Sequence, residues 1–175
     1  NGCTSLLEKV LFGNNIRQVR MEQPTTMDGV ERALDRAEQL ERENLNTYDI
    51  YAAITDHIGL KRLLSSLMED GKSHLQELEE FRARADTEEL FDETKAGSIG
   101  DLESSDVEYS FDASMDYIDF LRTIFEREEA LVAVYDALAG AAADNDAGYL
   151  FKRLAEDGRK HAWLAKDRYD LERLK

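Results

Sequence analysis

Two glutamates and two histidines stand where the sequence otherwise repeats apolar side chains at helical spacing. Glu41 and Glu128 lie on two such stripes, and His74 and His161 lie on two others. A buried carboxylate is costly unless it is paired or bound to a cation. Carboxylate and imidazole together are a ligand set for iron, manganese or zinc, and helical bundles often collect such ligands in their core. The pattern therefore predicts a metal centre inside a bundle.

These four residues belong to an internal repeat. A constant shift of 87 positions carries the first half of the sequence onto the second without a gap. Repetition of this kind indicates a duplicated structural unit with a pseudo-twofold relation. The matched pairs are Glu41 and Glu128, Tyr48 and Tyr135, Asp70 and Asp157, Gly71 and Gly158, and His74 and His161.

Further polar residues accompany each predicted ligand. Tyr48 and Tyr135 lie two helical turns after a glutamate and on the same face. Beside a metal they would hydrogen-bond a ligand carboxylate; without one they would be core aromatics. Asp70 and Asp157 lie four residues before a histidine. We expect these two carboxylates to be auxiliary metal ligands, reaching the site through a shifted or bulged helix.

An alternative without metal also fits each residue taken singly. A glutamate on an apolar stripe can pair with an arginine such as Arg42 or Arg127 and extend toward solvent. A single histidine on such a stripe is typically a hydrogen-bonded core residue, and the lone Trp163 is expected to pack in the core or at an interface. Four such residues at matching positions, one on each helix, favour the metal site.

The elements that must hold these residues are helices. Apolar residues recur every three or four positions over four stretches, separated by turns at 56–59 and 143–148. The fold predicted is all-α: an antiparallel four-helix bundle made of two repeated helix hairpins with a long crossover. The predicted helices are 28–56, 60–84, 115–142 and 149–174. The chain is predicted to consist of an N-terminal arm, 1–26, and a bundle, 27–175. Within the bundle, the hairpins are expected at about 27–84 and 114–175, joined by an acidic crossover at 85–113.

Composition narrows the function classes. The 175 residues carry 22 basic and 38 acidic side chains, a net charge of −16, which argues against a nucleic-acid partner. The single cysteine, Cys3, excludes a disulfide framework and a four-cysteine metal site within these residues. No run of about 18 apolar residues predicts a membrane span. We expect a cytoplasmic protein, with the apolar stretch 6–12 of the arm as the place for contact between subunits.

At these residues the sequence resembles the ferritin-like superfamily and, within it, the rubrerythrin-like proteins. In that family a glutamate precedes a tyrosine by seven residues, as in ERENLNTY at 41–48 and EEALVAVY at 128–135. The family's second motif, E-x-x-H, becomes EDGKSH at 69–74 and EDGRKH at 156–161. The histidines match, but glycine replaces the family's bridging glutamate in both halves.

The resemblance implies the ferritin-like bundle and a two-iron centre, with zinc or manganese as other metals. It implies a non-haem oxidoreductase that acts on peroxide or dioxygen or oxidises ferrous iron. It also implies a homodimer or larger homo-oligomer. Because the sequence lacks the paired C-x-x-C motifs of a rubredoxin domain, electrons would come from an external donor. Two alternatives follow from the missing glutamates: a mononuclear metal site, or a metal-free assembly or binding module.

Overall fold

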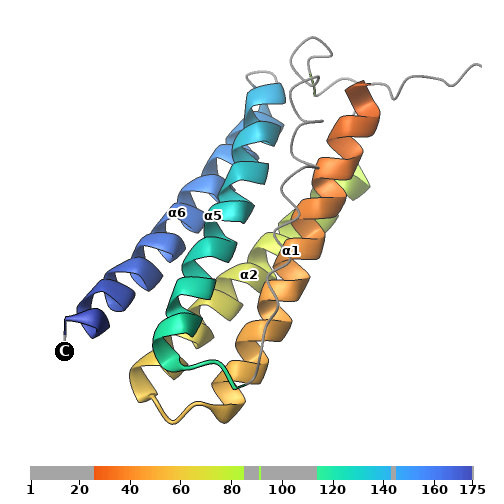
Figure 1. Cartoon of the computed structure of the whole chain (residues 1–175). Helices are drawn as coiled ribbons and strands as arrows, with labels where there is room; N and C mark the ends of the chain where they lie inside the picture. The colour runs from red at the N-terminus through yellow and green to blue at the C-terminus, as the bar shows by residue number, and fades with distance from the viewer. Residues whose placement is uncertain (1–25, 85–90, 92–113, 143–144, 175) are drawn as a thin grey trace, which may run out of the picture.

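The described part of the chain consists of four long helices in two hairpins (Figure 1). The computed structural model describes residues 26–84, 91, 114–142 and 145–174. The predicted all-α four-helix bundle is therefore confirmed. Nearly all of the predicted arm, including 6–12, lies outside the described residues. The helices are α1 (Thr26–Ile54), α2 (Ile58–Arg84), α5 (Tyr117–Ala141) and α6 (Asp146–Arg173).

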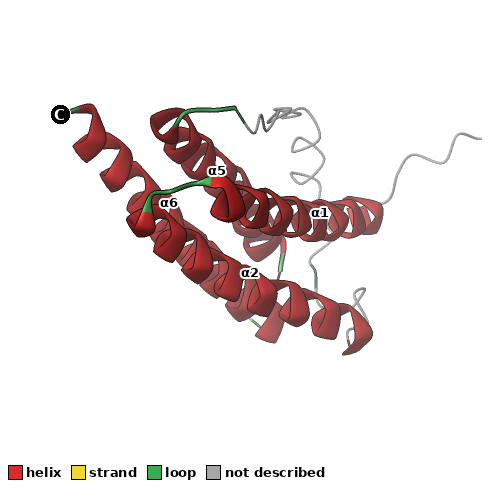
Figure 2. Cartoon of the chain, turned by 90° about the horizontal axis from the view of Figure 1, so that it is seen from below, coloured by secondary structure: helices red, strands yellow, loops and turns green. Residues whose placement is uncertain are grey.

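The second hairpin begins at the end of the bundle that lies opposite the end of α2. α5 begins beside the turn that joins α1 to α2, where the Tyr51 hydroxyl donates to the Met115 carbonyl at 3.0 Å. The ring of His57 in that turn stacks on Tyr117, with centroids 4.2 Å apart. Because α2 ends at the other end of the bundle (Figure 1), the connection cannot be a tight hairpin. α1 contacts α5 and α2 contacts α6, so the hairpins pack against each other (Figure 2).

Within the crossover, Phe91 is the residue that the structure describes. Its side chain is buried, and its ring lies 6.4 Å from Phe81 on α2 and 6.2 Å from Phe151 on α6, centroid to centroid. Its backbone also forms an isolated antiparallel bridge with Ala142, just after α5. These contacts attach the crossover to the end of the bundle where α2 ends and α6 begins.

Three helices begin earlier than their sequence pattern predicts: α1 at Thr26 and not at 28, α2 at Ile58 and not at 60, and α6 at Asp146 and not at 149. The helix predicted from 115, α5, begins later, at Tyr117. The turn expected at 56–59 lies at 55–57, because α1 ends at Ile54 and α2 already begins at Ile58. The turn expected at 143–148 ends at Asn145, whose side chain accepts a hydrogen bond from the Gly148 backbone. An asparagine cap of this kind satisfies an amide that would otherwise lack a partner. A polar residue at the edge of the predicted turn is thus the N-cap of α6.

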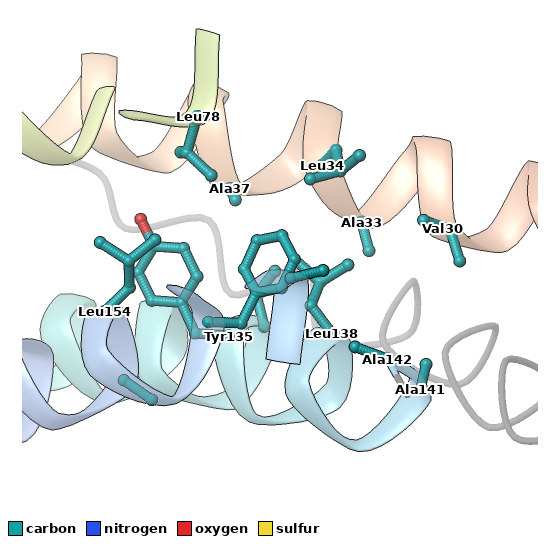
Figure 3. Close-up of a cluster of buried hydrophobic side chains, with 14 of the residues drawn as sticks. Val30, Ala33, Leu34, Ala37, Leu78, Tyr135, Leu138, Ala141, Ala142 and Leu154 are labelled. Carbon is teal, nitrogen blue, oxygen red and sulfur yellow. The ribbon is translucent and has the colours of Figure 1, made fainter. Parts of the chain in front are cut away.

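Two apolar clusters fill the bundle, one toward each end. The first surrounds Leu34, Tyr135 and Phe151, and Figure 3 shows the Tyr135 ring pointing from α5 toward α1 and α2. The second surrounds Tyr48 and Phe120. Along every helix a buried charged or imidazole residue lies between the two clusters: Glu41, His74, Glu128 and His161. None of the helices in the described residues is both long and apolar enough to cross a membrane.

Candidate metal centre

Each buried glutamate is bonded to a tyrosine of the other hairpin. The Tyr135 hydroxyl on α5 donates to Oε1 of Glu41 on α1 at 2.8 Å. The Tyr48 hydroxyl on α1 donates to Oε1 of Glu128 on α5 at 2.7 Å. Burial and the nearby carboxylate hold the pKa of both tyrosines well above the ordinary value of 10.0, so both remain donors. The predicted hydrogen bonds to the carboxylates are present, and they cross between the repeats.

Each histidine meets the glutamate of its own hairpin. His74 Nδ1 on α2 lies 3.0 Å from Glu41 Oε1, and His161 Nδ1 on α6 lies 3.3 Å from Glu128 Oε2. All four side chains are at least 91% buried. The two imidazole rings face each other with centroids 6.0 Å apart. The four residues that the repeat singles out are thus together in one polar layer of the core.

The two aspartates reach the layer from its outer side. Asp70 Oδ2 on α2 lies 3.0 Å from Nε2 of His161, and Asp157 Oδ2 on α6 lies 3.8 Å from Nε2 of His74. Both contacts cross between hairpins. α2 and α6 are α-helical without interruption around these residues, so the expected bulge is absent. The aspartates therefore face the imidazole nitrogen opposite the glutamate, at the solvent-facing edge of the layer.

Electrostatics of the layer follow from burial and from these contacts. Burial raises the pKa of Glu41, against the opposing effect of His74 and Tyr135. Burial alone would lower the pKa of His161, but the contacts with Glu128 and Asp70 outweigh it and the pKa is raised. A carboxylate thus faces both ring nitrogens of His161, which favours the ring form that carries a proton on each nitrogen.

The repeat-related glycines Gly71 and Gly158 are sites of close helix approach. A Cβ on Gly71 would lie 3.1 Å from Glu41 Oε2, and a Cβ on Gly158 would lie 2.8 Å from Cγ2 of Val132. Contacts this short leave no room for a larger side chain unless neighbours move. The space beside each glycine is therefore taken up by the partner helix within its hairpin.

The sequence interpretation missed a buried polar pair beside the layer. Arg127 Nε donates to Asn44 Oδ1 at 2.6 Å, its guanidinium also lies 3.4 Å from Glu43, and both Arg127 and Asn44 are buried. The repeat shift places Leu40 and Leu131 at the corresponding positions, and both are buried leucines. This exchange of a leucine pair for an arginine–asparagine pair was visible in the repeat.

Two further expectations from the sequence concern Arg42 and Trp163. Arg42 does not pair with Glu41: it donates instead to Glu79 at 2.7 Å on the surface. Trp163 is not a core residue, because 63% of it is exposed. It lies on the outer face of α5 and α6, beside a shallow pocket that also includes Phe125 and Val132.

The donor atoms of the layer suit transition-metal ions, and they form two Glu–His pairs, one in each hairpin. Metal–ligand bonds of about 2.0–2.2 Å place two ligands of one ion roughly 3.0–3.5 Å apart. The Glu41–His74 and Glu128–His161 contacts, at 3.0 and 3.3 Å, have this separation. Within the described ranges, no three His, Cys, Asp or Glu side chains already converge as a complete ligand cluster. Each half therefore offers two ligands, with its aspartate behind the imidazole.

Comparison with known proteins places the fold. No protein-family model and no curated protein matches the chain. A solved structure that resembles it is a two-domain protein from Anabaena variabilis ATCC 29413 that contains DJ-1/ThiJ/PfpI-like and ferritin-like domains. The two are 20% identical with a TM-score of 0.62, and the match covers 85% of this chain and 40% of that one, so this chain spans less than half of that protein's length. Together with the four helices, this likeness identifies the fold of the chain as ferritin-like.

Proposed function

We propose that the chain is a rubrerythrin-like metal-binding protein, an iron oxidoreductase that acts on peroxide or dioxygen or oxidises ferrous iron. One observation carries the proposal: two buried Glu–His pairs, one from each repeat, meet in a single layer of the core at ligand-to-ligand distances. Two carboxylates and two imidazoles at 91% burial or more are costly in an apolar core unless they are paired or bound to a cation.

In this proposal Glu41 and His74 hold one ion and Glu128 and His161 hold the second. A bound iron ion would supply or accept the electrons of the reaction; zinc or manganese suits the same donors. The absence of bridging glutamates means that each ion relies on its own pair, completed by solvent or by a carboxylate that turns toward it. An arrangement with a single ion shared by the two halves uses the same four residues.

The side chains around the ligands have defined tasks. Tyr135 and Tyr48 fix the orientation of the glutamates through the hydroxyl hydrogen bonds to Oε1. The aspartates face Nε2 of each imidazole and leave Nδ1 directed at the glutamate. A carboxylate beside the ring nitrogen that does not bind the metal is the usual second partner of a metal-binding histidine.

The proposal includes partners. An electron donor, either an external protein or a small reductant, belongs to the proposal, because the 175 residues contain a single cysteine and no C-x-x-C motif. Assembly into a homodimer or larger oligomer belongs to the same proposal. The outer face of α5 and α6, with exposed Trp163, is a surface where such contact would be looked for, in addition to the arm at 6–12.

Metal analysis tests the proposal. Protein purified after growth in iron-replete medium should carry up to two iron ions per chain, and Glu41→Gln/Glu128→Gln should lose them. The control is Glu69→Gln/Glu156→Gln, a repeat-related pair of exposed residues that removes the same charge. Wild-type protein that remains metal-free after dialysis against ferrous iron without oxygen would contradict the proposal.

A metal-free binding or assembly module is the second candidate, and the hydrogen bonding of the layer favours it. Each glutamate has a tyrosine and a histidine partner, and His161 has a carboxylate at both nitrogens. Thermal unfolding separates the two candidates, because a ligand that binds only the folded state raises Tm. The module predicts equal Tm with ferrous iron and with chelator; the metal protein predicts a higher Tm with iron.

A further inference from the structure

The two halves of the polar layer differ in the contact that orients the histidine. Asp70 Oδ2 lies 3.0 Å from Nε2 of His161, a hydrogen-bond distance. The repeat-related contact, from Asp157 Oδ2 to Nε2 of His74, is 3.8 Å and is too long for a hydrogen bond. The asymmetry lies in the aspartates, because Nδ1 of both histidines faces a glutamate at 3.0 and 3.3 Å.

Two basic residues account for the difference. Lys160 Nζ donates to Asp157 Oδ1 at 2.7 Å, and an Arg153 guanidinium nitrogen lies 3.7 Å from Asp157 Oδ2. Both are attached to α6 within one turn of Asp157. The repeat shift places Ser73 and Ser66 at the corresponding positions of α2, so Asp70 has no such lysine or arginine on its own helix. Asp157 therefore contacts the basic residues of its own helix, whereas Asp70 hydrogen-bonds to His161.

The basic residues also change the local charge. Near His74, the charge of Asp157 is opposed by Lys160 and Arg153, although Arg153 also pairs with Glu77. Near His161, the charge of Lys160 also acts on Asp70, but the hydrogen bond of Lys160 goes to Asp157. Arg127, which lies on the same side as Glu128, is held by Asn44 and Glu43. The half that contains His161 therefore has the better-oriented imidazole.

We propose that the two halves are not equivalent, and that Glu128 and His161 form the tighter cation site, with Asp70 as its positioning residue. Glu41 and His74 form the weaker site, whose occupancy is set by how far Lys160 and Arg153 hold Asp157 from His74. This inference rests on the proposed function, since it concerns the order in which the same core takes up metal. Loss of an outer carboxylate partner typically lowers metal affinity 10–100-fold, which sets the difference expected between the sites.

Cobalt(II) is the probe, because its binding is followed by visible absorption and by calorimetry without any reaction. The full chain, freed of metal, should bind Co²⁺ in two phases whose dissociation constants differ about 10-fold or more. His161→Gln should remove the tight phase and His74→Gln the weak one. Asp70→Asn should weaken the tight phase alone. Each variant is checked for folding by circular dichroism.

Two surface exchanges test the cause without touching the layer. Lys160→Ser with Arg153→Ser copies the α2 sequence onto α6 and should tighten the weak phase toward the strong one. Lys166→Ser is the control, since Lys166 is an exposed lysine on α6 that pairs with Asp170. It removes one charge without involving Asp157 and should leave the ratio of the two constants unchanged.

The outcomes separate this inference from the proposed function. Two equal phases, or a tight phase that survives His161→Gln and is lost in His74→Gln, overturn the inference and leave a metal protein. An unchanged ratio in Lys160→Ser/Arg153→Ser overturns the stated cause. No Co²⁺ binding in the folded wild-type chain overturns the inference and the proposed function together.

Discussion

Tyr135 donates its hydroxyl hydrogen to Glu41 across the bundle, over 2.8 Å, although the two residues are 94 positions apart in the chain. The repeat copies the bond in the opposite direction, from Tyr48 to Glu128 at 2.7 Å. The two hairpins are thus joined through the same buried groups that would bind a metal. A change at either tyrosine should affect both the stability of the bundle and the orientation of a ligand carboxylate.

Removing one of these hydroxyls should destabilise the protein. Tyr135→Phe leaves the Glu41 carboxylate with one donor fewer in a buried site, which costs about 1–3 kcal/mol of unfolding free energy. Urea denaturation of the metal-free protein measures this loss of unfolding free energy. Tyr149→Phe, at a tyrosine that is 67% exposed, is the control and should change the free energy by less than about 0.5 kcal/mol. Equal effects in the two variants would show that the buried bond contributes nothing.

The core glycines should not tolerate a methyl group. Gly158→Ala places a Cβ 2.8 Å from Val132 Cγ2, and overpacking of this kind costs about 1–3 kcal/mol. Gly140→Ala is the matched control in α5, because nothing lies within 4 Å of its Cβ position. It should stabilise the helix by up to about 1 kcal/mol. A gain in Tm from both substitutions would contradict the close helix approach at Gly158.

The buried Arg127–Asn44 pair should behave as a unit. Arg127→Leu alone strands the Asn44 amide and should destabilise the protein by about 1–3 kcal/mol. Adding Asn44→Leu recreates the leucine pair that Leu40 and Leu131 form in the other half, and should recover most of that loss. A double-mutant cycle on unfolding free energies gives the coupling. Additive losses would mean that the two side chains are energetically independent.

Stability of the metal-free protein should fall as pH rises above neutral. The folded pKa of His161 is above its ordinary value of 6.5, so the folded state holds a proton that the unfolded state has released. The contribution of His161 is therefore fully present below pH 6.5 and is lost as pH rises through the folded pKa. Glu41, whose pKa burial raises above 4.5, acts in the same direction from lower pH.

Urea denaturation between pH 6 and pH 9 checks this dependence. One proton changes the unfolding free energy by at most about 1.4 kcal/mol per pH unit. His161→Gln cannot take up the proton and should flatten the slope over this range. A wild-type stability that rises with pH would reverse the sign and contradict the account of the layer.

The architecture was predictable from the sequence because the apolar periodicity and the repeat describe the same four helices. The repeat also identified the residues of the layer, since Glu41 and His74 interrupt an apolar stripe at matched positions. Helix spacing places such residues on a common face, and burial in the structure follows from that face. Element boundaries were less predictable, because a capping residue such as Asn145 has the same composition as a loop.

The sequence could not show which side chains hydrogen-bond to one another within the layer. Spacing along one helix shows that Tyr48 and Glu41 share a face, but the hydrogen bond of Tyr48 goes to Glu128 on another helix. The direction of Asp70 was likewise fixed by how α2 and α6 pack, which no periodicity describes. Packing also explains the glycine at position 71, because Glu41 and Leu45 of α1 occupy the space next to it.

Anomalous scattering from crystals of the full chain grown with ferrous iron, without oxygen, tests the central claim most directly. Data on both sides of the iron absorption edge locate iron independently of any reaction. We predict iron-specific density between Glu41 and His74, between Glu128 and His161, or at both positions, with the stronger peak beside His161. The claim would be contradicted if no iron were found in the layer and the four side chains bonded only to one another and to water.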